Sequence, residues 1–140
     1  MDQRRQGKMK IVLDVSAAIG ILMKKESAAK YYNALQESSL VIAPDLYVSE
    51  LANTVWKYDF LKNQLQGESI KMIEDGINYI GYFINSKELW QEAFSEGIKN
   101  KHSVYDMYYM VAARRNGAVL VTNDSVLASI CKKNRIDVCC

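Results

Sequence analysis

The chain has 140 residues, of which 49% are hydrophobic and 24% are charged, which excludes both a disordered chain and two independent domains. Its 18 Lys and Arg residues against 16 Asp and Glu residues give a net charge of +2, too small for a global field that would identify nucleic acid as the ligand. Apolar runs end well before the ~18 residues of a membrane span, and three cysteines cannot form the paired framework of a small exported domain. We therefore expect a soluble protein of the reducing cytoplasm, with no membrane partner.

Residues 1–8 form a polar, basic tail, and residues 9–140 are predicted to make one domain. The domain opens with residues 9–15, an apolar and β-branched segment that has no polar face. This pattern predicts a strand buried on both sides that ends at Asp14. A helix should follow it, with Ser16 as its cap.

The middle of the chain predicts helices that alternate with short strands. A second helix should cover about residues 28–36, and residues 40–43 should form a second strand. Pro44 is predicted to be the first residue of a long helix, because its missing N–H is harmless there. Apolar residues at helical spacing support that helix and another one after it: Leu46, Leu51, Val55, Tyr58 and Leu61, then Ile70, Ile73, Ile77 and Ile80.

The last part of the chain continues the alternation. Strands are expected over residues 82–85, 118–121 and 136–139, and helices are expected to start at Ser86, Ser103 and Ser125, with Gly117 closing the second of these helices. Strands without a polar face that alternate with helices indicate a parallel sheet covered on both faces. The predicted fold class is α/β, doubly wound.

Four carboxylates stand where such a fold places a ligand, at the carboxyl ends of its strands. Asp14 and Asp124 each follow a buried strand, Asp106 falls in the first turn of a helix, and Glu50 shares a helix side with apolar residues. If these acids converge, their like charges need a cation, and oxygen ligands without His or Cys favour Mg²⁺ or Mn²⁺. Each acid alone also has an ordinary structural explanation, such as a helix cap or a solvated side chain.

Other polar and aromatic residues receive structural interpretations. His102 should be a solvent-exposed loop residue, and Tyr105, Tyr108 and Tyr109, at helical spacing, should mostly pack in the core. Basic residues near the rim are available for substrate phosphates, although exposed surface charge is the alternative explanation: Lys24, Lys25, Lys57, Arg114 and Arg115.

Four segments carry a resemblance to a known family. They are IVLDVSAAI from residue 11, APDLYVSELANTVWK from residue 43, SVYDMYYMVAAR from residue 103 and LVTND from residue 120. Together they resemble the signature stretches of PIN-domain ribonucleases and, in order and spacing, the VapC-type toxins of toxin–antitoxin modules. The resemblance covers nearly the whole chain.

This resemblance implies a five-stranded parallel sheet between helices and metal-dependent cleavage of RNA that leaves a 3′-hydroxyl and a 5′-phosphate. The family's metal-binding acids fall on Asp14, Glu50, Asp106 and Asp124, and Thr122 falls on a hydroxyl position that supports the site. The implied cofactor is Mg²⁺, with Mn²⁺ as a substitute. The implied partners are an RNA substrate and a cognate antitoxin protein.

Alternatives remain open at this point. A catalytically inactive PIN-fold interaction domain and a PIN nuclease of RNA processing without an antitoxin have the same motifs, whereas an aspartyl-phosphate phosphatase would need a second Asp at the position of Ser16. Amphipathic helices in a small domain predict a homodimer. Trp56, Phe60 and Leu61 broaden the apolar surface of the long helix and predict a docking surface for an antitoxin segment.

Overall fold

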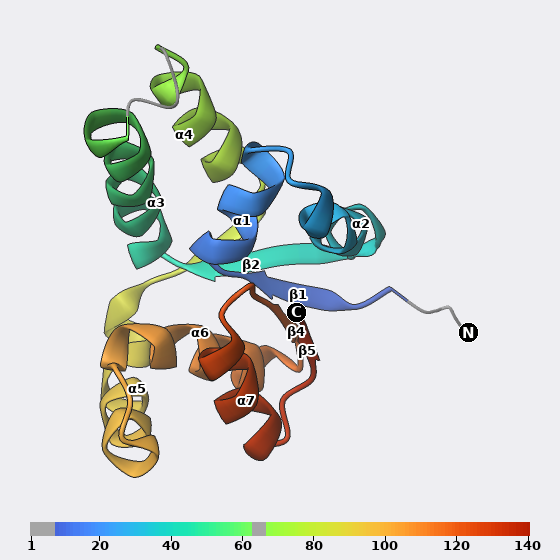
Figure 1. Cartoon of the computed structure of the whole chain (residues 1–140). Coiled ribbons are helices and arrows are strands. Elements are labelled where there is room, and N and C mark those ends of the chain that lie inside the picture. Colours follow the sequence, from blue (N-terminus) through green and yellow to red (C-terminus); the bar gives the residue numbers. More distant parts are fainter. Residues whose placement is uncertain (1–7, 63–66) are drawn as a thin grey trace.

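One parallel sheet organises the molecule. The computed structural model describes residues 8–62 and 67–140, so all of the basic tail except Lys8 lies outside the described residues. Five strands lie in the order β3-β2-β1-β4-β5, and every neighbouring pair is parallel (Figure 1). The strands are β1 Lys10–Leu13, β2 Leu40–Pro44, β3 Tyr82–Ile84, β4 Val119–Val121 and β5 Val138–Cys139. The predicted α/β class and five-stranded parallel sheet are therefore confirmed.

Helices cover both faces of this sheet. Figure 1 shows α1 to α4 on one side and α5 to α7 on the other. Their bounds are α1 Val15–Leu22, α2 Ala29–Glu37, α3 Leu46–Trp56, α4 Ser69–Asn78, α5 Ser86–Asn100, α6 Val104–Asn116 and α7 Ser125–Lys133. A short 3-10 turn, η1 (Glu26–Ala28), precedes α2, and a π-helical turn, η2 (Lys57–Leu61), extends α3. Across the described ranges, no helix combines the length and the apolar character needed to cross a membrane.

The strand order reverses at β1, and this reversal decides where a ligand site can form. On one side Ile11 pairs with Val41 of β2, and on the other side it pairs with Val119 of β4. The backbone N–H of Asp14 continues the second ladder by donating to Val121 O at 3.1 Å. Doubly wound sheets bind ligands beside the carboxyl ends of the strands at such a reversal. The end of β1 is therefore the expected place for a site.

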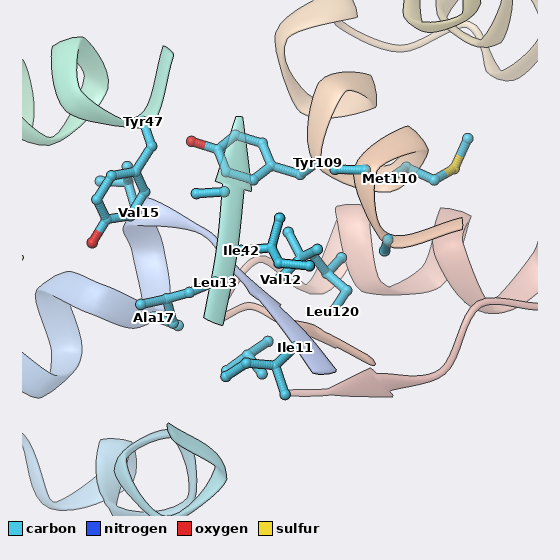
Figure 2. Packing of buried hydrophobic residues seen from close by; sticks show 14 of the residues in the cluster. Ile11, Val12, Leu13, Val15, Ala17, Ile42, Tyr47, Tyr109, Met110 and Leu120 are labelled. Carbon is cyan, nitrogen blue, oxygen red and sulfur yellow. The ribbon is translucent and has the colours of Figure 1, made fainter. Parts of the chain in front are cut away.

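The core is built around β1, as its uninterrupted apolar sequence predicts. Val12 and Leu13 have no exposed surface, and Ile11 is almost fully buried. Figure 2 shows these side chains packed with Ile42 of β2 and Leu120 of β4 at the centre of the domain. Burying each such side chain stabilises the fold by roughly 1.5–3 kcal/mol, so the strand that carries Asp14 is firmly anchored.

Pro44 does not begin the long helix, so that prediction was wrong. It is the last residue of β2, where it lies opposite Ile84 of β3, and α3 begins two residues later at Leu46. The ladder continues through the N–H of Asp45, which donates to Ile84 O at 2.9 Å. Because the next residue supplies the donor, a proline without an N–H is tolerated at the end of the strand.

Two of the predicted helix caps lie one or two residues earlier in the chain than expected. Asp14, not Ser16, caps α1 by accepting the N–H of Ala17 at 3.0 Å, and Asn85, not Ser86, caps α5. Gly117 closes α6 in the left-handed conformation, as predicted, with φ of +58°. Sequence patterns place a cap to within a residue or two, because several short polar side chains can occupy that position.

Candidate active site

A cavity of about 450 Å³ lies at the carboxyl end of β1, and all four predicted acids line it. Asp14 comes from the end of β1, Glu50 from α3, Asp106 from the first turn of α6, and Asp124 from the loop that leaves β4. Two strand ends and two helices from opposite faces of the sheet therefore deliver one carboxylate each to the same cavity.

Asp14 is the most buried of these acids, with 5% of its surface exposed. Its carboxylate accepts hydrogen bonds from the Thr122 hydroxyl, the Ser16 hydroxyl at 2.7 Å and the Ala17 N–H at 3.0 Å. Burial is the largest influence and raises the pKa of Asp14 from 3.8 to about 6, while these hydrogen bonds lower it and the charge of Asp106 raises it. The protein therefore holds an ionised Asp14 at a cost that a nearby cation would offset.

Thr122 joins the ends of β1 and β4. Its buried hydroxyl donates to Asp14 Oδ2 and accepts the backbone N–H of Asp124 at 3.0 Å. The Ser16 hydroxyl lies 3.3 Å from the Thr122 hydroxyl. One threonine thus fixes the position of one acid directly and of a second acid through its backbone.

Glu50 is held by a tyrosine that the sequence interpretation assigned to core packing. The Tyr109 hydroxyl donates to Glu50 Oε1 at 2.6 Å, while the ring of Tyr109 is buried in the core (Figure 2). Burial raises the pKa of Glu50, and this hydrogen bond lowers it. A signal was present in the sequence, because Tyr109 follows Asp106 by three residues and so shares its helix face.

Asp106 contacts His102, and this corrects the prediction that His102 is a solvent-exposed loop residue. His102 Nε2 lies 2.7 Å from Asp106 Oδ2, and the histidine side chain is only 21% exposed. The two residues are four apart in the sequence, a spacing that brings side chains together within a helix. His102 was predicted to lie in the loop before α6, so this spacing was not taken as a sign of contact.

Asp124 has a structural role as well as a place in the cavity. Its Oδ1 accepts the N–H groups of Val126 at 2.9 Å and Leu127 at 3.1 Å, and so caps α7. This is the cap that the sequence offered as the ordinary explanation for Asp124. The cap and the cavity position coexist, because the N-terminus of α7 faces the same edge of the sheet.

The basic residues named from the sequence divide into three groups. Lys24 lines a separate pocket beside α4 and not this cavity. Lys25 and Lys57 line the cavity. Arg114 and Arg115 bind acids of α5 instead: Arg114 lies 2.8 Å from Glu96, and Arg115 lies 2.9 Å from Glu92. These two arginines are not among the residues that line the cavity, and their ion pairs agree with the alternative explanation of surface charge.

Comparison with known proteins shows the family of the chain. The family model of the PIN domain matches residues 11–133, nearly the whole chain. The chain belongs to the PIN domain family. This PIN domain is 28% identical over 122 residues to Ribonuclease VapC3 of Pyrobaculum aerophilum, covering 86% of this chain and 93% of that protein.

Solved structures share the fold of this PIN domain. PAE2754 from Pyrobaculum aerophilum matches with a TM-score of 0.67 and 19% identity, over 87% of this chain and 84% of that one. VapBC2 from Rickettsia felis, solved bound to a DNA fragment from its promoter, matches with a TM-score of 0.65 and 15% identity, over 93% of this chain and 97% of that one. The protein is thus a PIN-domain protein that resembles VapC ribonuclease toxins, as its sequence predicted.

The donor chemistry of the cavity fits a hard divalent cation. Within the described residues, no three His, Cys, Asp or Glu side chains are close enough together to surround one ion. Mg²⁺ does not need such a cage, because proteins usually bind it through one or two carboxylates while water supplies the other ligands. The cavity offers carboxylate oxygens of this kind: Asp14 is buried with a raised pKa, and burial and the charges of Asp106 and Asp14 raise the pKa of Glu50.

Proposed function

We propose that this PIN domain is a metal-dependent endoribonuclease that acts as the toxin of a toxin–antitoxin module. The convergence of Asp14, Glu50, Asp106 and Asp124 on one cavity carries the proposal. The relative VapC3, whose name describes a ribonuclease, supports the choice of RNA as the substrate. Hydrolysis of a phosphodiester bond is the chemistry that such a cavity favours, because carboxylates hold the cations that neutralise phosphate charge.

Each acid has a defined task in this proposal. Asp14 and Asp106 hold the cation most tightly, and Glu50 and Asp124 hold it directly or through water. A bound Mg²⁺ or Mn²⁺ supplies an activated water and positive charge near the scissile phosphate. Thr122 keeps Asp14 in place, and Tyr109 does the same for Glu50.

The two lysines of the cavity give the substrate its orientation. Lys25 follows α1, and Lys57 begins η2, so they approach the cavity from different elements. Their ammonium groups are suited to bind phosphates of the RNA on both sides of the cleaved bond. Such contacts position a strand without selecting its sequence.

Removal of the metal tests the activity. The purified protein should cut a single-stranded RNA in the presence of Mg²⁺ or Mn²⁺, and excess EDTA should reduce the rate on the order of 10³-fold, because no other group in the proposal activates water. Restoring Mn²⁺ should restore the rate. Asp14→Asn, purified in parallel, reveals any contaminating nuclease. Cleavage that is unaffected by EDTA, or no cleavage by the parent with Mn²⁺, would contradict the proposal.

We propose that α5 forms the interface of a homodimer. Trp90, Phe94 and Ile98 are spaced by four residues along α5 and are 53%, 55% and 68% exposed, so they form an apolar stripe on the helix. Antiparallel pairing of two α5 helices about a twofold axis covers this stripe.

A second apolar surface suits the antitoxin. Trp56 and Phe60 stack with ring centroids 5.2 Å apart, and Leu61 lies beside them in sequence; all three are exposed. They lie at the end of α3 and in η2, next to Lys57, which lines the cavity. An apolar antitoxin segment on this surface is well placed to bring a basic side chain to the acids, which would compete with the metal. Residues 63–66, which come shortly after η2 in the sequence, lie outside the described residues.

Paired variants separate the two surfaces. The double variant Trp90→Ser, Phe94→Ser should sediment as a monomer but still co-purify with the protein encoded by the neighbouring open reading frame. The double variant Trp56→Ser, Phe60→Ser should remain a dimer and lose that partner. A monomeric parent at micromolar concentration would contradict the homodimer, and failure of any partner to co-purify with the parent would contradict the toxin–antitoxin assignment.

A further inference from the structure

The loop between α5 and α6 fixes the backbone of His102. Lys101 ends α5 in the left-handed conformation, with φ of +53°, and the N–H of His102 donates to Gly97 O at 3.1 Å. A Cβ atom on Gly97 would lie 3.1 Å from the carbonyl oxygen of His102 and 3.0 Å from Val104 Cγ2. These distances are shorter than ordinary van der Waals contact, so a larger residue at position 97 would push the loop away from α5 by a few tenths of an ångström, and the glycine lets the backbone of His102 pack closely against the helix.

From this position the side chain of His102 reaches the cavity acid on the next helix. Its Nε2 lies 2.7 Å from Asp106 Oδ2, and both side chains are partly shielded from solvent. Because a carboxylate only accepts, Nε2 carries the proton and donates it to Oδ2. Within the described part of the chain this is the hydrogen bond that the Asp106 carboxylate makes, so Oδ1 is left for another ligand.

We propose that His102 is a positioning residue for the cation site, which holds Oδ2 of Asp106 so that this side chain binds the cation through Oδ1 alone. The inference rests on the proposed function, since it assumes that Asp106 is a metal ligand. It assigns a role to the single histidine of the chain, which the acid chemistry of the cavity does not otherwise use.

Holding one oxygen has a consequence for the choice of metal. Ca²⁺ takes six to eight oxygen ligands and readily binds both oxygens of a carboxylate, whereas Mg²⁺ demands octahedral geometry and takes one oxygen from each carboxylate. The N–H group uses one lone pair of Asp106 Oδ2 and holds the carboxylate in one orientation, so binding of a cation by both oxygens would compete with the hydrogen bond, whereas binding through Oδ1 would not. His102 therefore favours Mg²⁺ and Mn²⁺ over Ca²⁺. It also holds the Asp106 side chain in place before a cation binds, so that binding costs less conformational entropy.

The competing explanation is that the pair only stabilises the start of α6. A His–Asp pair at a spacing of four residues contributes about 0.5 kcal/mol or less to a helix. On that explanation, loss of the imidazole would lower the stability slightly and leave cation binding unchanged. The two explanations therefore differ in a binding measurement rather than in a stability measurement.

The test measures Mn²⁺ affinity by the paramagnetic resonance signal of free Mn²⁺, and Ca²⁺ affinity by competition. His102→Phe keeps a ring but loses the donor, and should weaken Mn²⁺ binding by about 10-fold or more while Ca²⁺ binding changes less. His102→Gln places an amide N–H near the position of Nε2 and should restore both the affinity and the selectivity. Tyr105→Phe, on the exposed face next to Asp106, is the matched control.

The outcomes separate this inference from the proposed function. If the parent does not bind Mn²⁺, both fail. If the parent binds Mn²⁺ and His102→Phe shows the same affinity and the same preference over Ca²⁺, only the role of His102 is overturned. His102→Ala repeats the comparison if the phenylalanine variant does not fold, as judged by circular dichroism.

Discussion

Asp14→Asn is expected to reduce RNA cleavage on the order of 10³-fold and, at the same time, to stabilise the metal-free protein at pH 7. The loss follows from the removal of the most buried charge in the cavity. The gain follows because burial raises the pKa of Asp14 from 3.8 to about 6, so that ionising it in the folded protein at pH 7 costs about 1–3 kcal/mol. Asparagine keeps an oxygen that can accept from Ala17, and it carries no charge.

The pH dependence of this gain is a second part of the same prediction. A carboxyl whose pKa is higher in the folded chain binds its proton more tightly there, so its unfavourable contribution is absent below about pH 4 and grows as the pH rises to about 6. The stability advantage of Asp14→Asn should therefore be present at pH 7 and vanish near pH 4.

Urea denaturation in EDTA at the two pH values measures this advantage directly. Asp75→Asn is the matched control, because the side chain of Asp75 on α4 is largely exposed and pairs only weakly with Lys71. If Asp14→Asn cleaves RNA at the rate of the parent, Asp14 is not part of the catalytic site. If the variant is less stable than the parent at pH 7, burial of the Asp14 charge does not destabilise the folded protein.

Glu50→Gln and Tyr109→Phe are expected to impair cleavage by acting on one shared hydrogen bond. Glu50→Gln removes a charge and should lower the rate by about 10²-fold or more, and Tyr109→Phe should lower it by about 10–100-fold because Glu50 loses the donor 2.6 Å away. In the double variant the cleavage rate should fall by much less than the product of the two separate reductions, because Tyr109 no longer has a charged carboxylate to hold once Glu50 is replaced.

Tyr47→Phe is the control for this cycle. The Tyr47 hydroxyl is equally buried and donates to Gly76 O at 2.7 Å, away from the acids. Its removal should cost about 1 kcal/mol of stability without changing the rate of cleavage. Strictly multiplicative effects of Glu50→Gln and Tyr109→Phe, measured as rates on the same RNA, would show that Tyr109 does not act through Glu50.

The parts of this fold that could be predicted from the sequence are those governed by pattern. An apolar run such as residues 11–13 has no polar face, so it can only be a strand buried on both sides, and the residue after it must reach the edge of the sheet. The same reasoning predicted the strand before Asp124. Glu50 was noticed because its helix side is apolar, and the structure places its carboxylate in the cavity.

The parts that could not be predicted depend on partners from distant segments. In the sequence, nothing near Arg114 indicates an ion pair. Its partners Glu92 and Glu96 lie 22 and 18 residues earlier in the chain, on α5. Tyr109 was predicted to be a core residue, and the acceptor of its hydroxyl, Glu50 on α3, lies 59 residues earlier in the chain. Periodicity says which side of a helix is buried, but it does not say which polar group that side will meet.

The chemistry of the RNA ends distinguishes hydrolysis at the carboxylate cavity from cleavage by the RNA's own 2′-hydroxyl. We expect water to attack the phosphorus and the 3′-oxygen to leave, as the resemblance to PIN-domain ribonucleases implies, so that each cut leaves a 5′-phosphate and a 3′-hydroxyl and the RNA's own 2′-hydroxyl takes no part. The products of the metal-loaded parent should therefore be degraded by an exonuclease that requires a 5′-phosphate, without prior kinase treatment. Products with a 5′-hydroxyl and a 2′,3′-cyclic phosphate would show that the RNA attacked itself, and would contradict a hydrolytic site built from Asp14, Glu50, Asp106 and Asp124.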